Sequence, residues 1–164
     1  MAMNGLKDVY IDQCQDLYSA CKQSAEATRQ LHEAAKNDEL RQALKAGVEG
    51  IQDGMSKVES IVRAHGADPT GEHCKGMEGL VKEARAHALE EEFSDDDARD
   101  AMIISQYQRM AHYAIAGWGT LAAYARRLGL EDDARTLHEN LEHTKHGDVH
   151  MSQIAEGTVN PKAA

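Results

Sequence analysis

The chain has 164 residues and a mass of 18.0 kDa, enough for one domain with a substantial buried core. Its formal net charge of −10 would repel phosphate groups, so nucleic acids and anionic membrane surfaces are poor partners. Two prolines, one tryptophan, five tyrosines and one phenylalanine make a composition that favours helices over sheets.

The first predicted helix spans residues 5–36. Its inward residues advance by alternating steps of four and three, which is the pattern of a helix face directed at a partner helix. They are Tyr10, Cys14, Leu17, Cys21, Ser24, Thr28, Leu31 and Ala35. Asn37 and Asp38 supply turn and cap chemistry, and a second helix follows up to Gly66. Its stripe is Leu40, Leu44, Gly47, Ile51, Gly54, Val58, Ile61 and His65.

A shorter helix is predicted over residues 74–89. The acidic stretch after it predicts an N-terminal cap near Ser94, at the start of a third long helix that ends at Gly129. The third stripe is Ala101, Ile104, Gln108, Ala111, Ile115, Trp118, Ala122 and Ala125. The fourth is Ala134, Leu137, Leu141, Thr144, Asp148, Met151 and Ala155. Short links within each pair and one long connection between the pairs predict two antiparallel hairpins joined by a crossover. We therefore expect one all-α, ferritin-like four-helix bundle over residues 1–164, with a core at 5–155 and a flexible tail at 156–164.

The middle of each stripe is small or polar. The residues concerned are Cys21, Gly47, Gly50, Gly54, Ala111, Ala114, Thr144 and Asp148. A glycine inside a helix costs about 1 kcal/mol relative to alanine, so three of them indicate that the space is required. Either the helices pack closely there, or a pocket lies there, bordered by Tyr107, Tyr113, Trp118 and by Met55 or Met110.

Four segments of the chain resemble motifs of a known bacterial family. The segment DLYSACKQ resembles DLYxAEKQ, and HCKGMEGLVKEA resembles KCxAMEGLIxEA. The segment QRMAHYAIAGWGTLAAYARRLG resembles QRVEHYEIAxYGTLxAxAxxLG, and LEHTKHGD resembles LxEEKxxD. All four motifs are those of the YciE/YciF-type ferritin-like proteins. The resemblance covers Asp8 to Ala155. It implies a ferritin-like fold, an association with stress responses and a homodimer. Exposed apolar residues such as Val9, Ile11, Ile103 and Leu121 would be natural contact points in that dimer.

The same resemblance implies a lost metal centre. Family members that hold two metals would place carboxylates, with one His or Gln, at the positions of Cys21, Gly50, Gly54, Ala111, Ala114, Thr144 and Asp148. Only Asp148 keeps a carboxylate, whereas a pair of iron or manganese ions needs several bridging carboxylates. We therefore expect no metal, no other cofactor and no catalytic residue. Losing all the carboxylates together also avoids leaving unpaired buried charges.

The first interpretation is thus a non-catalytic, stress-associated protein that acts by association with itself or with another protein. One alternative is a metal-dependent oxidase or peroxide-handling protein with iron or manganese at an altered site around Asp148, His112 and Cys21. A second alternative is a small-molecule binding protein that uses the glycine-lined interior.

Two other groups of residues have simpler readings. One helical facet could bind a metal through His143, His146 and His150, but a solvated polar face explains these residues better. We interpret His112 as a hydrogen-bonded structural side chain. Cys14, Cys21 and Cys74 lack CxxC spacing and are expected to be reduced. Without a long apolar run or a signal-like start, the protein is expected in the cytoplasm.

Overall fold

The computed structural model describes residues 2–164, and these contain helices but no strand. The helices are α1 (Leu6–Ala34), α2 (Asp38–Ala64), α3 (Lys75–Ala84), η1 (Arg85–Glu90), α4 (Asp96–Arg127), α5 (Glu131–Ile154), η2 (Ala155–Val159) and α6 (Asn160–Ala163). The two η segments are π-helical continuations of α3 and α5. The prediction of an all-helical chain is confirmed.

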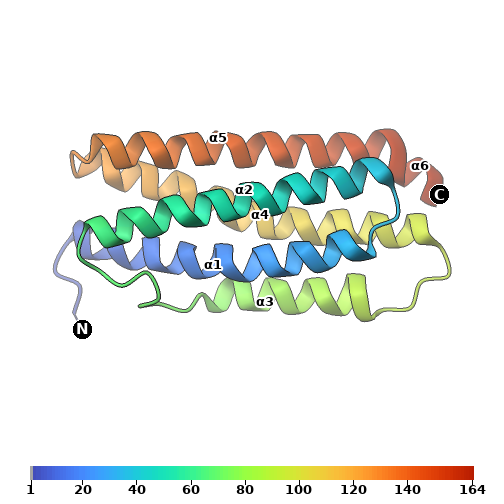
Figure 1. Ribbon diagram of the computed structural model, residues 1–164, viewed down its shortest axis with the longest axis horizontal. Coiled ribbons are helices and arrows are strands. Elements are labelled where there is room, and N and C mark those ends of the chain that lie inside the picture. Colours follow the sequence, from blue (N-terminus) through green and yellow to red (C-terminus); the bar gives the residue numbers. More distant parts are fainter. Residues whose placement is uncertain (1) are drawn as a thin grey trace.

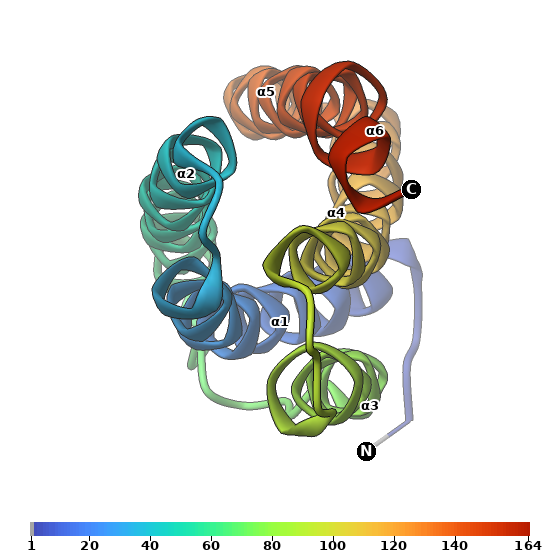
Figure 2. The same ribbon diagram turned by 90° about the vertical axis from the view of Figure 1, so that its right-hand side faces the viewer.

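The four long helices run side by side (Figure 1). The chain forms an antiparallel hairpin from α1 and α2, returns along the bundle through residues 65–95, and forms a second antiparallel hairpin from α4 and α5. Seen end-on, α1, α2, α5 and α4 surround a common axis, while α3 lies outside and packs against α1 and α4 (Figure 2). The crossover and its extra helix lie where the sequence predicts them.

Local signals set the ends of the long helices. The side chain of Asn37 accepts a hydrogen bond from the backbone N–H of Leu40 at 3.0 Å and caps α2. Gly66 and Gly129, just beyond α2 and α4, have φ of 74° and 73°, the left-handed backbone in which glycine commonly ends a helix.

The start of α4 ties two parts of the bundle together. Its cap is Asp95, next to Ser94 where the sequence predicts a cap; the Asp95 carboxylate accepts a first-turn backbone hydrogen bond at 2.8 Å and lies at the positive end of the helix dipole. One turn later the fully buried Asp100 carboxylate accepts hydrogen bonds from the backbone N–H groups of Lys36 at 3.0 Å and Asn37 at 2.7 Å. Because a buried carboxylate is tolerated only when it is satisfied, Asp100 fixes the α1–α2 turn against α4.

The core follows the predicted stripe closely on α1 and less closely on α2, α4 and α5. The whole first stripe, within residues 10–35, is buried, whereas the stripe on α2 is only half-buried at Gly47 and Ile51. Ile103 and Leu121 are 0% and 1% exposed, so the prediction that they are exposed dimer contacts is wrong. The reason is that α4 packs against α1, α3 and α5, and so buries more than one stripe.

The last residues are helical where the sequence predicts a flexible tail. Segments η2 and α6 continue α5 and pack against α4, and Val159 is fully buried. Val159 extends the apolar face of α5 by one turn beyond Ile154, which gives the tail something to bury. Within residues 2–164, no helix has the length and apolar character needed to cross a membrane.

Candidate functional site

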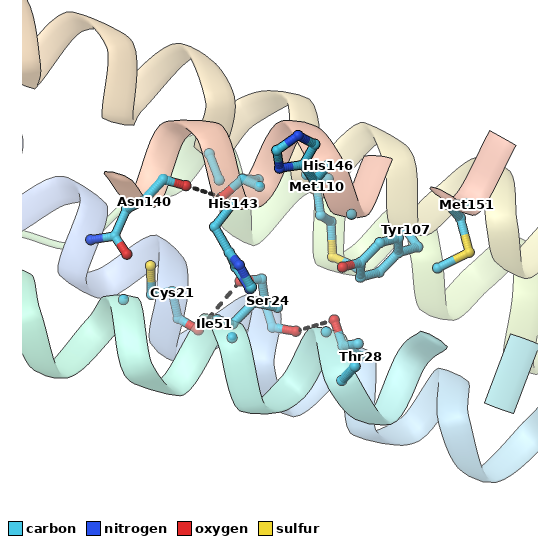
Figure 3. Close-up of a pocket in the computed structure, with 18 of the residues that line it drawn as sticks. Cys21, Ser24, Thr28, Ile51, Tyr107, Met110, Asn140, His143, His146 and Met151 are labelled. Atoms are coloured by element: carbon cyan, nitrogen blue, oxygen red, sulfur yellow. Dashed lines mark hydrogen bonds between the residues drawn. The ribbon is translucent and has the colours of Figure 1, made fainter. Parts of the chain in front are cut away.

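A cavity of about 530 Å³, here called the central slot, lies between the four long helices (Figure 3). The lining residues on α1 and nearly all of those on α4 are buried, whereas several on α2 and α5 are exposed, so the slot opens between α2 and α5. Six of the seven positions at which the family resemblance implies metal ligands line it, namely Cys21, Gly50, Gly54, Ala111, Ala114 and Thr144. They are joined by Leu17, Ala20, Ser24, Thr28, Glu39, Gln42, Ala43, Ala46, Gly47, Ile51, Met77, Tyr107, Met110, Trp118, Asn140, His143, His146, Gly147, His150 and Met151.

The glycine face of α2 exists because three side chains reach across to it. A Cβ atom at Gly47 would lie 2.7 Å from the Tyr107 hydroxyl, one at Gly50 would lie 3.0 Å from Nε2 of His143, and one at Gly54 would lie 2.9 Å from the Trp118 ring. These distances are shorter than ordinary van der Waals contact. The glycines therefore allow close approach by particular side chains, while the remaining space between the helices stays open.

The closed end of the slot is formed by Trp118, Leu17 and Asn140. Trp118 is 3% exposed and is the only tryptophan in the chain. Asn140 is 7% exposed, and its Nδ2 atom has no hydrogen-bond partner within residues 2–164. A buried N–H without a partner costs about 1–3 kcal/mol, so Asn140 stands out in an otherwise satisfied wall.

The serine and threonine hydroxyl groups in the wall are already bonded to their own helices. Thr28 donates to the backbone oxygen of Ser24 at 2.7 Å, and Thr144 donates to that of Asn140 at 2.8 Å. Burial raises the pKa of the Cys21 thiol to about 12, so this sulfur stays protonated at neutral pH and is a weak ligand and nucleophile. Burial, and then the negative charge of Asp148, raise the pKa of Tyr107 to about 12.

The histidines of α5 form one rim of the slot. His143 reaches from α5 across the opening toward α2 (Figure 3), while His146 and His150 lie along the same rim. The sequence favours a solvated face for these residues; they are exposed, but all three also line the slot. Among residues 2–164, no three or more His, Cys, Asp or Glu side chains come together in a way that could hold a metal ion.

Asp148 does not line the slot, contrary to the prediction. Its carboxylate lies between α5 and α4, where one oxygen accepts a hydrogen bond from Gln108 at 3.2 Å and the other lies 2.9 Å from Nε2 of His112. The reading of His112 as a hydrogen-bonded side chain agrees with this contact. The last carboxylate of the predicted metal positions therefore binds α4 and does not face the bundle axis.

Tyr113 also lies elsewhere. It was predicted as a pocket wall, but its hydroxyl donates to Asp16 at 2.8 Å and accepts from the Cys74 thiol at 2.9 Å. It borders a separate cavity of about 210 Å³ between α1 and α4. Met110 lines the central slot, as one of the two predicted methionines, and Met55 does not.

Comparison with known proteins places the chain in a family. The model of the family described as "Domain of unknown function (DUF892)" matches residues 5–164. This chain belongs to that family. It is 35% identical to protein YciF of Escherichia coli K12 over 164 residues, which cover 99% of this chain and 98% of that protein.

Three solved structures share the fold. The crystal structure of the E. coli stress protein YciF matches 98% of this chain and 100% of its own with a TM-score of 0.89 and 34% identity. A protein described as a putative structural protein from Rhodopseudomonas palustris matches with a TM-score of 0.86 and 32% identity, over 93% of this chain and 96% of its own. A Xanthomonas campestris protein at 17% identity and a TM-score of 0.76 covers 97% of both chains and shows the fold alone.

Asn140 is a buried residue of the site that the sequence analysis did not predict in this DUF892 chain. The predicted stripe on α5 advances through Leu137, Leu141 and Thr144, but the buried face advances through Leu137, Asn140 and Thr144. A signal was available, since Gly147 and Ile154 continue this alternative spacing. The two spacings share Leu137, Thr144 and Met151 and differ at every other step.

Proposed function

We propose that this protein is a non-enzymatic member of its family whose bundle centre is a binding cavity for a small molecule in place of a dinuclear metal site. The observation that carries the proposal is the central slot itself. Six of the seven positions at which the family resemblance implies metal ligands line this slot, which supports a shared location.

The donor atoms around the slot support the absence of a metal pair. The six lining positions offer two glycines, two alanines, a thiol that stays protonated and a hydroxyl that is already bonded to the backbone. Glu39 is the one carboxylate among the lining residues, and it lies on the exposed edge of α2. Iron and manganese pairs need several bridging carboxylates, so the residues present do not fit such a centre.

The size and surface of the slot support binding. Small-molecule sites in proteins have volumes of roughly 300–1,000 Å³ and are mostly apolar with a few placed polar groups. The central slot falls within this range and combines the Trp118 ring with the amide of Asn140. The E. coli relative is described as a stress protein, so we propose that binding in the slot serves a stress response.

Two measurements on one preparation test the proposal. Protein expressed in medium supplemented with iron and manganese should contain far less than two metal ions per chain. It should also bind the neutral dye Nile red. Ala114→Leu, which adds three carbon atoms to the slot wall, should weaken dye binding, whereas Ala123→Leu on the exposed face of the same helix should not. Two metals per chain, or equal dye binding by both variants, would overturn the proposal.

Self-association is a second proposed property. The R. palustris relative is described as a putative structural protein. The resemblance of this chain to the YciE/YciF-type proteins implies a homodimer. Val9 and Ile11 remain half-buried at the start of α1, and Val149 on α5 is 55% exposed, so apolar side chains are available for contacts. Light scattering after size exclusion should give twice the chain mass of 18.0 kDa. A species of 18.0 kDa alone would refute a stable dimer.

A further inference from the structure

The polar groups of the central slot are unevenly distributed. At its closed end the amide of Asn140 lies beside the Trp118 ring and faces Gly54, where its Oδ1 would be 3.8 Å from a Cβ atom. The amide nitrogen has no partner within residues 2–164, and the Thr144 hydroxyl bonds only to the backbone of Asn140. Rotation of the amide exchanges its oxygen and nitrogen, so this end can accept or donate one hydrogen bond to a molecule in the slot.

The charges around the slot disfavour an anionic ligand group at its closed end, because the side chains that could carry a positive charge, His143, His146 and His150, lie on the rim. Within residues 2–164, no lysine or arginine side chain lines it, and its one carboxylate, Glu39, is on the rim. The chain as a whole carries a net charge of −10. A buried anion would lack a cationic partner, and a buried cation would lack a carboxylate at the closed end. The part of the ligand at the closed end is therefore uncharged.

The shape of the slot indicates an elongated ligand. Its α2 wall extends from Gly54 to Glu39, which is roughly 22 Å at about 1.5 Å per residue. Tyr107 lies opposite Gly47, and Met151 lines the slot on α5, so the wall remains mostly apolar along this length. A linear apolar body fits such a space better than a compact polar one.

We propose that the central slot binds a neutral, elongated apolar molecule with one uncharged oxygen group, an alcohol or a carbonyl, held at its closed end by the amide of Asn140 and the Trp118 ring. This rests on the proposed function, because it names the ligand class of the same cavity. The apolar body extends from that end along the glycine face of α2. The molecule leaves or enters past His143, which crosses the opening.

Trp118 provides a direct readout because it is the only tryptophan and lines the slot. Its emission is titrated at pH 8 with 1-decanol, 2-decanone, decanoate and decylamine, which have similar chains and different end groups. We expect saturable changes with the alcohol and the ketone, and at least tenfold weaker binding of the two charged compounds. Whichever neutral compound binds more tightly identifies the group that Asn140 recognises.

A variant isolates the hydrogen bond. Asn140→Leu replaces the amide with an apolar side chain of similar size and so removes both hydrogen-bonding atoms, and the neutral compounds should bind about fivefold more weakly. Ala123→Leu on the outer face of α4 is the matched control and should bind as the unaltered protein does. Circular dichroism confirms that each variant is folded.

The outcomes separate the two proposals. If decanoate binds as tightly as 1-decanol, or if Asn140→Leu binds the neutral compounds unchanged, the ligand class is wrong while a binding slot remains. If none of the four compounds and no Nile red enters the slot, the proposed function itself fails.

Discussion

Replacement of Gly54 by alanine tests whether the glycine face of α2 is required by its neighbours. A new Cβ atom would lie 2.9 Å from the Trp118 ring, so the ring or the helix must move by about 0.5 Å to reach the shortest ordinary contact of 3.4 Å. Overpacking of this kind in a buried site costs about 1–3 kcal/mol. Alanine also gains about 1 kcal/mol over glycine as a helix former. The expected net effect is a destabilisation of about 0–2 kcal/mol.

Gly79→Ala is the matched control. Gly79 lies inside α3 and has nothing within 4 Å of an added Cβ atom, so the helix-forming gain should appear alone as a stabilisation of about 0.5–1 kcal/mol. Urea unfolding followed by circular dichroism at 222 nm measures both changes. If Gly54→Ala stabilises the protein as much as Gly79→Ala does, the close approach of Trp118 does not explain the glycine.

Three further predictions concern buried polar groups. Asp100→Ala should destabilise the protein by about 2–4 kcal/mol in urea unfolding, because two backbone N–H groups of the α1–α2 turn lose their acceptor in a partly buried site; a loss below about 0.5 kcal/mol would refute this role. Tyr10→Phe should cost about 1–2 kcal/mol, since the buried Tyr10 hydroxyl donates to Asp133 at 2.9 Å, and an unchanged midpoint would contradict it. Burial raises the pKa of Cys21 from 9.0 to about 12. The contribution of this thiol to the stability of the fold is therefore fully present below pH 9 and is lost as the pH rises toward 12. Alkylation of native Cys21 by iodoacetamide at pH 8 should therefore be about a thousandfold slower than in urea, as followed by peptide mass spectrometry, and equal rates would disprove the burial.

Much of the fold can be predicted from the spacing of apolar residues. The first stripe is buried along its whole length because α1 contacts α2, α3 and α4 at once. Asn37 and the two positive-φ glycines define helix ends through local backbone chemistry, which can be predicted from the residue types alone. The burial of Ile103 could not be predicted in this way, since it depends on the crossover segment packing against a second face of α4.

The predicted centre residues on α1, α2 and α4 line the slot, whereas the stripe predicted on α5 differs from its buried face. An ideal helix has 3.6 residues per turn, so steps of four and three that start at Leu137 can follow either Leu141 and Asp148 or Asn140 and Gly147. The first series faces α4, where Leu141 contacts Gly119 and Asp148 contacts His112. The histidines of the rim were missed as slot residues because a stripe gives the direction of a helix face. It does not give the distance between α2 and α5.

The most direct test of the metal-free slot is a crystal structure of protein from cells supplied with iron and manganese, with anomalous scattering measured at both absorption edges. We expect no anomalous peak between the four long helices, with water or an organic molecule along Gly47, Gly50 and Gly54. Two anomalous peaks about 3.5–4 Å apart at the level of Cys21 and Thr144 would contradict the proposal.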